Sequence, residues 1–177
     1  MPYDEERVAE LLLHFAEATE SDETAGSTKY NKILYFADLT FLRRFGRTIT
    51  GATYQKNPNG PTLRRMLPIV RRLTEEGAAK EVERDFLGKT QKRLLALRRP
   101  DLSAFEAEEI SVVDAVIREL WGMTATKASE LSHDDLGWRA VGYGDDIPLE
   151  LAFIETDPVV TDEMRERARK LAANLPR

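Results

Sequence analysis

The sequence predicts an α+β fold that is predominantly α-helical, in which a helical domain surrounds one central apolar helix and carries a small antiparallel hairpin. Residues 27–45 place apolar side chains on most sides of a helical wheel, as a central helix does. Other stretches repeat apolar residues every three or four positions, which is typical of amphipathic helices. Two strand-like runs occupy residues 78–99. A chain of 177 residues is expected to form a single domain spanning 1–177.

The first elements follow from helix start and stop signals. Residues 3–17 are expected to form an amphipathic helix whose acidic first turn suits the helix dipole. Residues 18–27 are small and polar without an apolar period, so a mobile loop is expected. Ser27 or Thr28 is expected to cap the start of the central helix, and Gly46 stands where a left-handed residue ends a helix.

The central helix is expected to expose only a narrow edge that includes Lys32 and Arg43. Asp38 lies among the apolar positions instead. Because a buried carboxylate without donors is costly, we expect a tyrosine hydroxyl, an arginine or backbone amides against it. A structural role is favoured over a catalytic one, since general acid–base chemistry needs a second titratable group nearby and the sequence shows none.

A stiff corner follows the central helix. Residues 47–56 read as an extended segment that leads into Pro58-Asn59-Gly60-Pro61. The two prolines fix φ on either side of Asn-Gly, which adopts open or left-handed conformations at low cost. Pro61 suits the first position of the next helix, and Gly77 marks its end.

That helix is expected to carry a basic strip opposite its apolar face. The strip consists of Arg64, Arg65, Arg71 and Arg72. Pro68 falls in the same strip, where it predicts a kink or a break. The strip is interpreted as a solvated face, a protein-binding face or, with residues 78–99 as the wing, a winged-helix DNA reader. The first two are favoured because acidic flanks oppose a duplex.

The rest of the chain reads as a hairpin followed by helices. In residues 78–99, Glu81 and Glu83 are expected to pair across the strands with Lys92 and Arg93. A helix is expected to begin with a Ser103–Glu106 capping box and to end at Gly122. Two short helices are expected within 124–141, and a polar terminal helix is expected at 161–174.

Composition and motifs exclude several classes of function. The chain has no cysteine, which rules out disulfides and thiol chemistry and suggests a reducing, cytoplasmic setting. No stretch approaches the roughly 20 apolar residues of a membrane span, so no membrane partner is expected. Nucleotide-binding, metalloprotease and hydrolase motifs are absent, so neither catalytic residues nor a cofactor are expected. His133 beside Asp134 and Asp135 reads as a helix start more readily than as a metal site.

Charge is strongly segregated along the chain. Residues 29–99 carry seventeen basic and six acidic residues, whereas 1–28 carry one basic and eight acidic, and 100–177 carry eight basic and seventeen acidic. This asymmetry indicates either an anionic partner or an internal clamp in which acidic segments fold back onto the basic centre.

Three separated segments carry a resemblance to a known family. They are KYNKILYFADLTFLRRFGRTITGATYQKNPNGPTLRRM, SELSHDDLGWRAV and GDDIPLELAF, which together span about residues 29–153. In this order they resemble the Panacea domain of SocA-like antitoxins. Pro68 departs from the family pattern, because it interrupts the helix after the turn.

The resemblance implies a mostly helical domain with a small sheet, acting in a bacterial or phage toxin–antitoxin system. It implies neutralisation of a cognate toxin by direct binding and, in SocA-like cases, delivery of the toxin to a protease; a winged-helix-like DNA-binding regulator is the other alternative. Matching positions expected to be structural are Tyr35, Phe36, Asp38, Gly60 and Pro61. Matching positions expected to be partly exposed, and to contact the partner together with the four arginines, are Lys32, Tyr54, His133 and Trp138.

Overall fold

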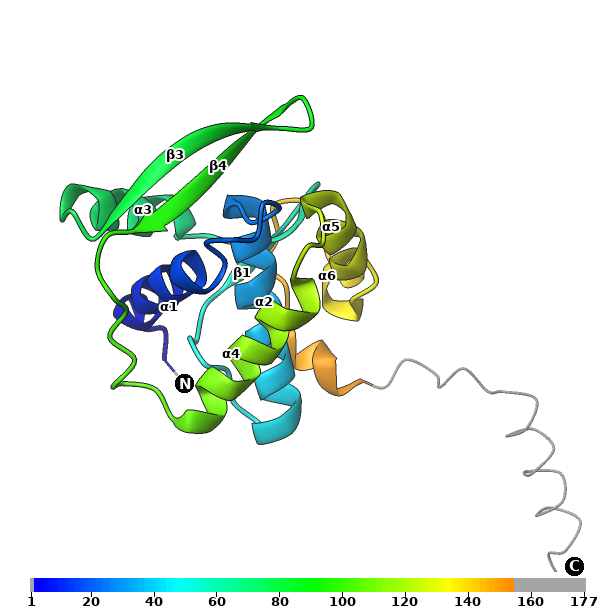
Figure 1. The fold of residues 1–177 in the computed structure, drawn as a ribbon. Coiled ribbons are helices and arrows are strands. Elements are labelled where there is room, and N and C mark those ends of the chain that lie inside the picture. The colour runs from blue at the N-terminus through cyan, green and yellow to red at the C-terminus, as the bar shows by residue number, and fades with distance from the viewer. Residues whose placement is uncertain (1, 155–177) are drawn as a thin grey trace, which may run out of the picture.

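The computed structural model describes residues 2–154 and has the predicted α+β, mostly helical fold (Figure 1). Its helices are α1 (Glu5–Ala18), α2 (Ser27–Phe45), α3 (Met66–Glu75), α4 (Ala107–Leu120), α5 (Ala125–His133), α6 (Leu136–Ala140) and the short 3-10 helix η1 (Leu149–Phe153). Its strands are β1 (Tyr54–Asn57), β2 (Gly60–Leu63), β3 (Ala79–Phe86) and β4 (Lys89–Ala96). Among these residues no helix is long and apolar enough to cross a membrane.

Helix α2 is central, as predicted. It packs against α4, α5, β2, β4 and η1, and Figure 1 shows it running through the middle of the molecule. The N-cap is Gly26, so the predicted cap at Ser27 or Thr28 is wrong, and Gly46 ends the helix with a φ of 73°. Phe45, expected among the packed residues, is half exposed at the last turn. The central helix therefore organises one continuous apolar core that extends from α1 to Ile147.

Residues 18–27 form an anchored turn, so the expected mobile loop is wrong. The buried carboxylate of Asp22 accepts a hydrogen bond from Lys29 Nζ at 2.7 Å. Arg93, from β4, donates to the carbonyl oxygens of Asp22 at 2.9 Å and of Thr19 at 3.0 Å. Arg93 is thus buried against this turn and does not pair across its own hairpin, because its long side chain reaches unpaired carbonyls on the other face.

The Pro58–Pro61 corner is a second antiparallel hairpin, which the sequence analysis did not predict. Strand β1 pairs with β2 in a register that places Tyr54 opposite Leu63 and Asn57 opposite Gly60. Pro61 therefore lies in β2 and does not begin a helix. Helix α3 begins only at Met66, which puts Pro68 in its first turn. A proline there removes an N–H that has no intrahelical acceptor, so the predicted kink is absent.

The β3–β4 hairpin agrees with the prediction and projects from the body of the molecule in Figure 1. Its turn holds Leu87 and Gly88 at φ of 55° and 73°. Lys92 Nζ lies 3.4 Å from Glu81 and 3.9 Å from Glu83, which confirms cross-strand pairing for that lysine.

The later helices follow the predicted order with one different cap. The capping box of α4 joins Glu106, as N-cap, to Glu109; Ser103 lies outside it. Gly122 follows α4 with a φ of 67°. Helices α5 and α6 are the two expected short helices. The terminal helix expected at 161–174 lies outside the described residues.

Candidate functional site

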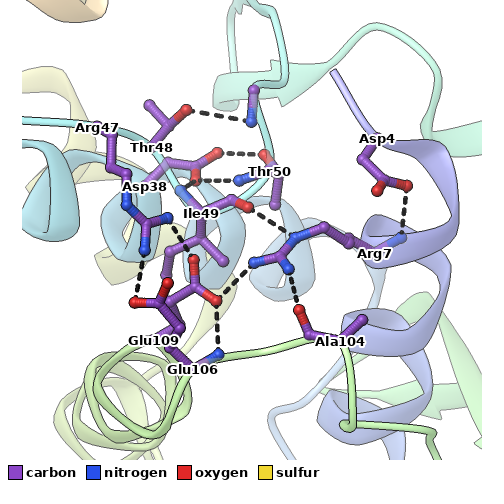
Figure 2. Close-up of polar contacts among 11 residues, drawn as sticks. Asp4, Arg7, Asp38, Arg47, Thr48, Ile49, Thr50, Ala104, Glu106 and Glu109 are labelled. Atoms are coloured by element: carbon purple, nitrogen blue, oxygen red, sulfur yellow. Dashed lines mark hydrogen bonds and ion pairs between the residues drawn. The ribbon is translucent and has the colours of Figure 1, made fainter. Parts of the chain in front are cut away.

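Asp38 anchors the chain that leads from α2 into β1. Its carboxylate accepts hydrogen bonds from the amides of Ile49 at 2.7 Å and Thr50 at 3.0 Å, from the Tyr54 hydroxyl at 2.7 Å and from the Thr50 hydroxyl. Figure 2 shows the backbone and threonine part of this arrangement. The predicted donors to Asp38 are confirmed. Tyr54 is fully buried by the same contact, so its expected exposure is wrong.

A second polar cluster, drawn in Figure 2, joins α1 to α4. The Glu109 carboxylate forms ion pairs with Arg7 at 2.6 Å and with Arg47 at 2.6 Å, and Arg47 also forms an ion pair with Glu106 at 2.7 Å. Burial opposes the charge of Glu109, but the Glu106 amide and the two guanidinium groups keep its pKa below the ordinary value. No sequence motif marks this cluster, and its one available signal is Arg7, the single basic residue among the acids of the first 28.

Lys32 is 1% exposed, so its predicted place on a solvent-exposed edge is wrong. The β1–β2 hairpin covers it, and its Nζ donates to the carbonyl oxygen of Pro61 at 2.8 Å. The neighbouring Asn31 accepts a hydrogen bond from the Leu63 amide at 2.8 Å. Helix α2 therefore holds β2 through two consecutive side chains. Burial lowers the pKa of Lys32 to about 7.

Gly60 lies at a position where no side chain fits. Its φ is 88°, and a Cβ there would lie 2.7 Å from Lys32 Cε and still closer to Ser132 Oγ. The hairpin, α2 and α5 thus meet at this glycine.

Tyr35 positions the loop before α6. Its hydroxyl donates to Asp135 Oδ1 at 2.5 Å, and the same oxygen accepts from the Trp138 amide at 3.2 Å as the N-cap of α6. The Phe36 ring lies edge-on to Tyr35 with centroids 5.7 Å apart. The central helix therefore fixes the orientation of the helix turn that carries Trp138.

His133 and Trp138 form an aromatic cluster with two residues that the sequence analysis did not single out. The rings of His133 and Trp138 stack with centroids 4.0 Å apart and planes at 15°. Lys56 Nζ lies 4.1 Å from the Trp138 centroid and 5.3 Å from that of Tyr143, which is 67% exposed. Burial and the nearby Lys32 lower the pKa of His133, which favours a neutral ring at pH 7. Residues 2–154 contain no group of three His, Cys, Asp or Glu placed to hold a metal.

The predicted basic strip is largely paired within the chain. The ion pairs are Arg64 with Asp146 (2.6 Å), Arg65 with Glu5 (2.8 Å) and Arg72 with Glu6 (2.9 Å). Arg71 is exposed and makes no ion pair with the part of the chain described. Arg64 and Arg65 precede α3, so the four do not form one helix face. The acidic segments therefore fold back onto the basic centre, which is one of the two interpretations of the charge pattern.

The 142–146 loop joins the arginine region to the aromatic cluster. Arg64 Nη2 donates to the Gly144 carbonyl at 3.2 Å, and the Gly144 amide donates to the Lys56 carbonyl at 2.8 Å. Residues far apart in sequence thereby form one continuous candidate surface, defined as Lys56, Arg64, His133, Trp138 and Tyr143.

The model of the family described as Antitoxin SocA-like, Panacea domain matches residues 31–139, which is more than half of the chain. The chain therefore belongs to the SocA-like Panacea antitoxin family. Searches of the curated proteins and of the solved structures found no match. The matched segment contains Asp38, Lys32, both hairpins and every residue of the candidate surface except Tyr143.

Proposed function

We propose that this protein is an antitoxin that neutralises a cognate toxin by direct binding through the candidate surface, without chemistry of its own. The observation that carries the proposal is the family match over residues 31–139, which includes four of the five residues of that surface. The mechanism is occlusion. An interface of roughly 800 Å² per partner would cover the toxin's active site or bar its target.

The composition and rigidity of the candidate surface support this role. Tryptophan, tyrosine and arginine are the residue types that most often dominate binding energy at protein interfaces. Trp138 is held from two sides, by the Asp135 cap beneath it and by Lys56 over its ring. A surface ordered before binding loses less side-chain entropy in the complex, so more of the contact energy contributes to affinity.

Neutralisation in cells tests the proposal. The gene product encoded next to this chain should arrest growth when expressed alone and lose that effect when this chain is co-expressed. Tyr143→Ala is expected to weaken the rescue, because the exposed ring packs against Trp138 and Lys56 of the candidate surface. Leu87→Asn is the matched control, since Leu87 is 80% exposed at the tip of β3–β4 and Asn suits its positive φ. A neighbouring product that is harmless alone, or toxic despite co-expression, would refute the role.

Two other modes are separated by their own assays. A DNA regulator would show salt-dependent gel shifts, which the pairing of three arginines with carboxylates disfavours. A proteolytic adaptor would accelerate degradation of the toxin by a protease. Under occlusion, the toxin is inhibited while its amount stays constant.

A further inference from the structure

Helix α3 carries an apolar residue on its solvent face. Met66, Ile69 and Leu73 are buried in the core and form the apolar inner face of this amphipathic helix. Leu67 lies outside that face and is 76% exposed, more than any other large apolar side chain on the helices of residues 2–154. The next residue, Pro68, is exposed as well. The packing of α3 therefore does not account for Leu67.

Arg71, one turn further along α3, is the arginine of the predicted basic strip that the fold leaves without a counter-ion. Its neighbour Arg72 forms an ion pair with Glu6 at 2.9 Å. Arg71 is exposed and has no carboxylate within ion-pair distance in residues 2–154, although Glu75 lies four residues further along the same helix. The acidic segments that fold back onto the basic centre thus leave one arginine of the strip available to an outside carboxylate.

Leu67, Pro68 and Arg71 form one exposed ridge, called the α3 ridge. Side chains three or four residues apart are neighbours on a helix, so Arg71 lies beside both Leu67 and Pro68. The stem of an arginine side chain is apolar and covers apolar surface, while its guanidinium group stays in water. The ridge therefore combines a protruding apolar patch with a single positive charge at its end.

The α3 ridge borders the candidate surface. Arg64 belongs to that surface, pairs with Asp146 of the 142–146 loop at 2.6 Å, and lies three residues before Leu67. Arg64 and Arg65 are both exposed, so exposed side chains lead from this loop to the first turn of α3. A stable interface takes roughly 20 to 30 residues from each partner, so toxin contacts must extend beyond the five residues of the candidate surface.

We propose that the toxin-binding interface continues from the candidate surface onto the α3 ridge, where Leu67 enters an apolar pocket of the toxin and a toxin carboxylate pairs with Arg71. This rests on the proposed function, because the occupant is the toxin. Burial of Leu67 gains hydrophobic free energy, and the planar guanidinium of Arg71 matches a carboxylate in two parallel hydrogen bonds. A second copy docked ridge to ridge would bring two Arg71 side chains together, and a duplex would find only one free arginine in this strip.

Isothermal titration of the toxic product of the neighbouring gene into wild-type and variant chains, at low and high salt, tests the proposal. Leu67→Ser and Arg71→Glu are each expected to raise the dissociation constant by about tenfold or more. Arg71→Met should raise it less and reduce its salt dependence, because salt screens an ion pair across an interface. Thermal unfolding should stay within about 2 °C of the wild type in all three variants, since both side chains are exposed.

Leu87→Asn and Arg84→Glu are the matched controls, because both residues are exposed on the β3–β4 hairpin that projects from the body in Figure 1. Both should bind the toxin as the wild type does. A complex that Tyr143→Ala weakens, but that Leu67→Ser and Arg71→Glu leave unchanged, overturns the role of the α3 ridge and leaves the proposed function standing. Absence of any complex overturns both. A dimer of this chain that Leu67→Ser dissociates, or duplex binding that Arg71→Glu abolishes, overturns the toxin as the occupant.

Discussion

Replacing Lys32 by methionine is expected to stabilise the fold, even though a buried hydrogen bond is lost. Burial lowers the pKa of this lysine from 10.5 to about 7. Each pKa unit corresponds to about 1.4 kcal/mol, so burying the charged form costs about 4 to 5 kcal/mol. The hydrogen bond to Pro61 offsets only about 1 kcal/mol. At pH 7, Lys32→Met should therefore raise the free energy of unfolding by about 3 to 4 kcal/mol.

The pH dependence of the free energy of unfolding provides a second measurement of the same effect. Between pH 7 and 10.5 the unfolded chain keeps a proton on Lys32 that the folded chain releases. The unfolded state then binds more protons, so the free energy of unfolding rises with pH across this window. Lys32→Met should remove that rise. Urea unfolding at pH 7 and 9.5, followed by tryptophan fluorescence, measures both quantities.

Lys29→Met is the matched control because the same substitution breaks an ion pair. It leaves the buried Asp22 carboxylate without its lysine, which is expected to lower stability by about 3 kcal/mol. Opposite signs for the two substitutions are the predicted result. If Lys32→Met destabilises the fold as much as Lys29→Met does, Lys32 has a counter-charge and the reasoning is wrong.

Three further substitutions, the first with a matched control, test the scaffold around the candidate surface. Gly60→Ala should lower the free energy of unfolding by about 2 to 4 kcal/mol, because the added Cβ would collide with Lys32 and Ser132. Gly88→Ala, which has open space around it, should lower it by about 1 kcal/mol. Denaturant midpoints compare the two variants. Asp38→Ala should lower the free energy of unfolding by about 3 kcal/mol or more in the same assay, since it leaves the buried donors around this carboxylate without an acceptor. Glu109→Gln should lower the free energy of unfolding at pH 7 by about 3 kcal/mol and make it less sensitive to acidification. The reason is that the pKa of Glu109 is lowered in the fold, so its carboxylate stabilises the fold above the unfolded value of 4.5 and this contribution fades as pH falls. An unchanged acid transition would contradict this.

Local signals in the sequence predicted the features that depend on one helix or one turn. Asp38 was expected to need donors because it is a polar residue among apolar positions of α2, and the structure supplies them from residues 49–54. Gly46 and the β3–β4 hairpin followed from equally local patterns.

Features that depend on distant segments were missed. The exposure of Lys32 was misjudged because the hairpin that covers it was read as a bend before a helix. Arg93 was expected to pair with a nearby acid, yet it reaches the carbonyl of Asp22, 71 residues earlier. Tyr143 joins Trp138 only through the fold of the 142–146 loop, and no periodic pattern marks such a contact.

The dissociation constant between this chain and the toxic product of its neighbouring gene tests the central claim most directly. Titration calorimetry on the purified pair is predicted to show a stable complex that Tyr143→Ala weakens by about tenfold or more and Leu87→Asn leaves unchanged. Suppression of toxicity without any measurable complex between the two proteins would contradict neutralisation by direct binding.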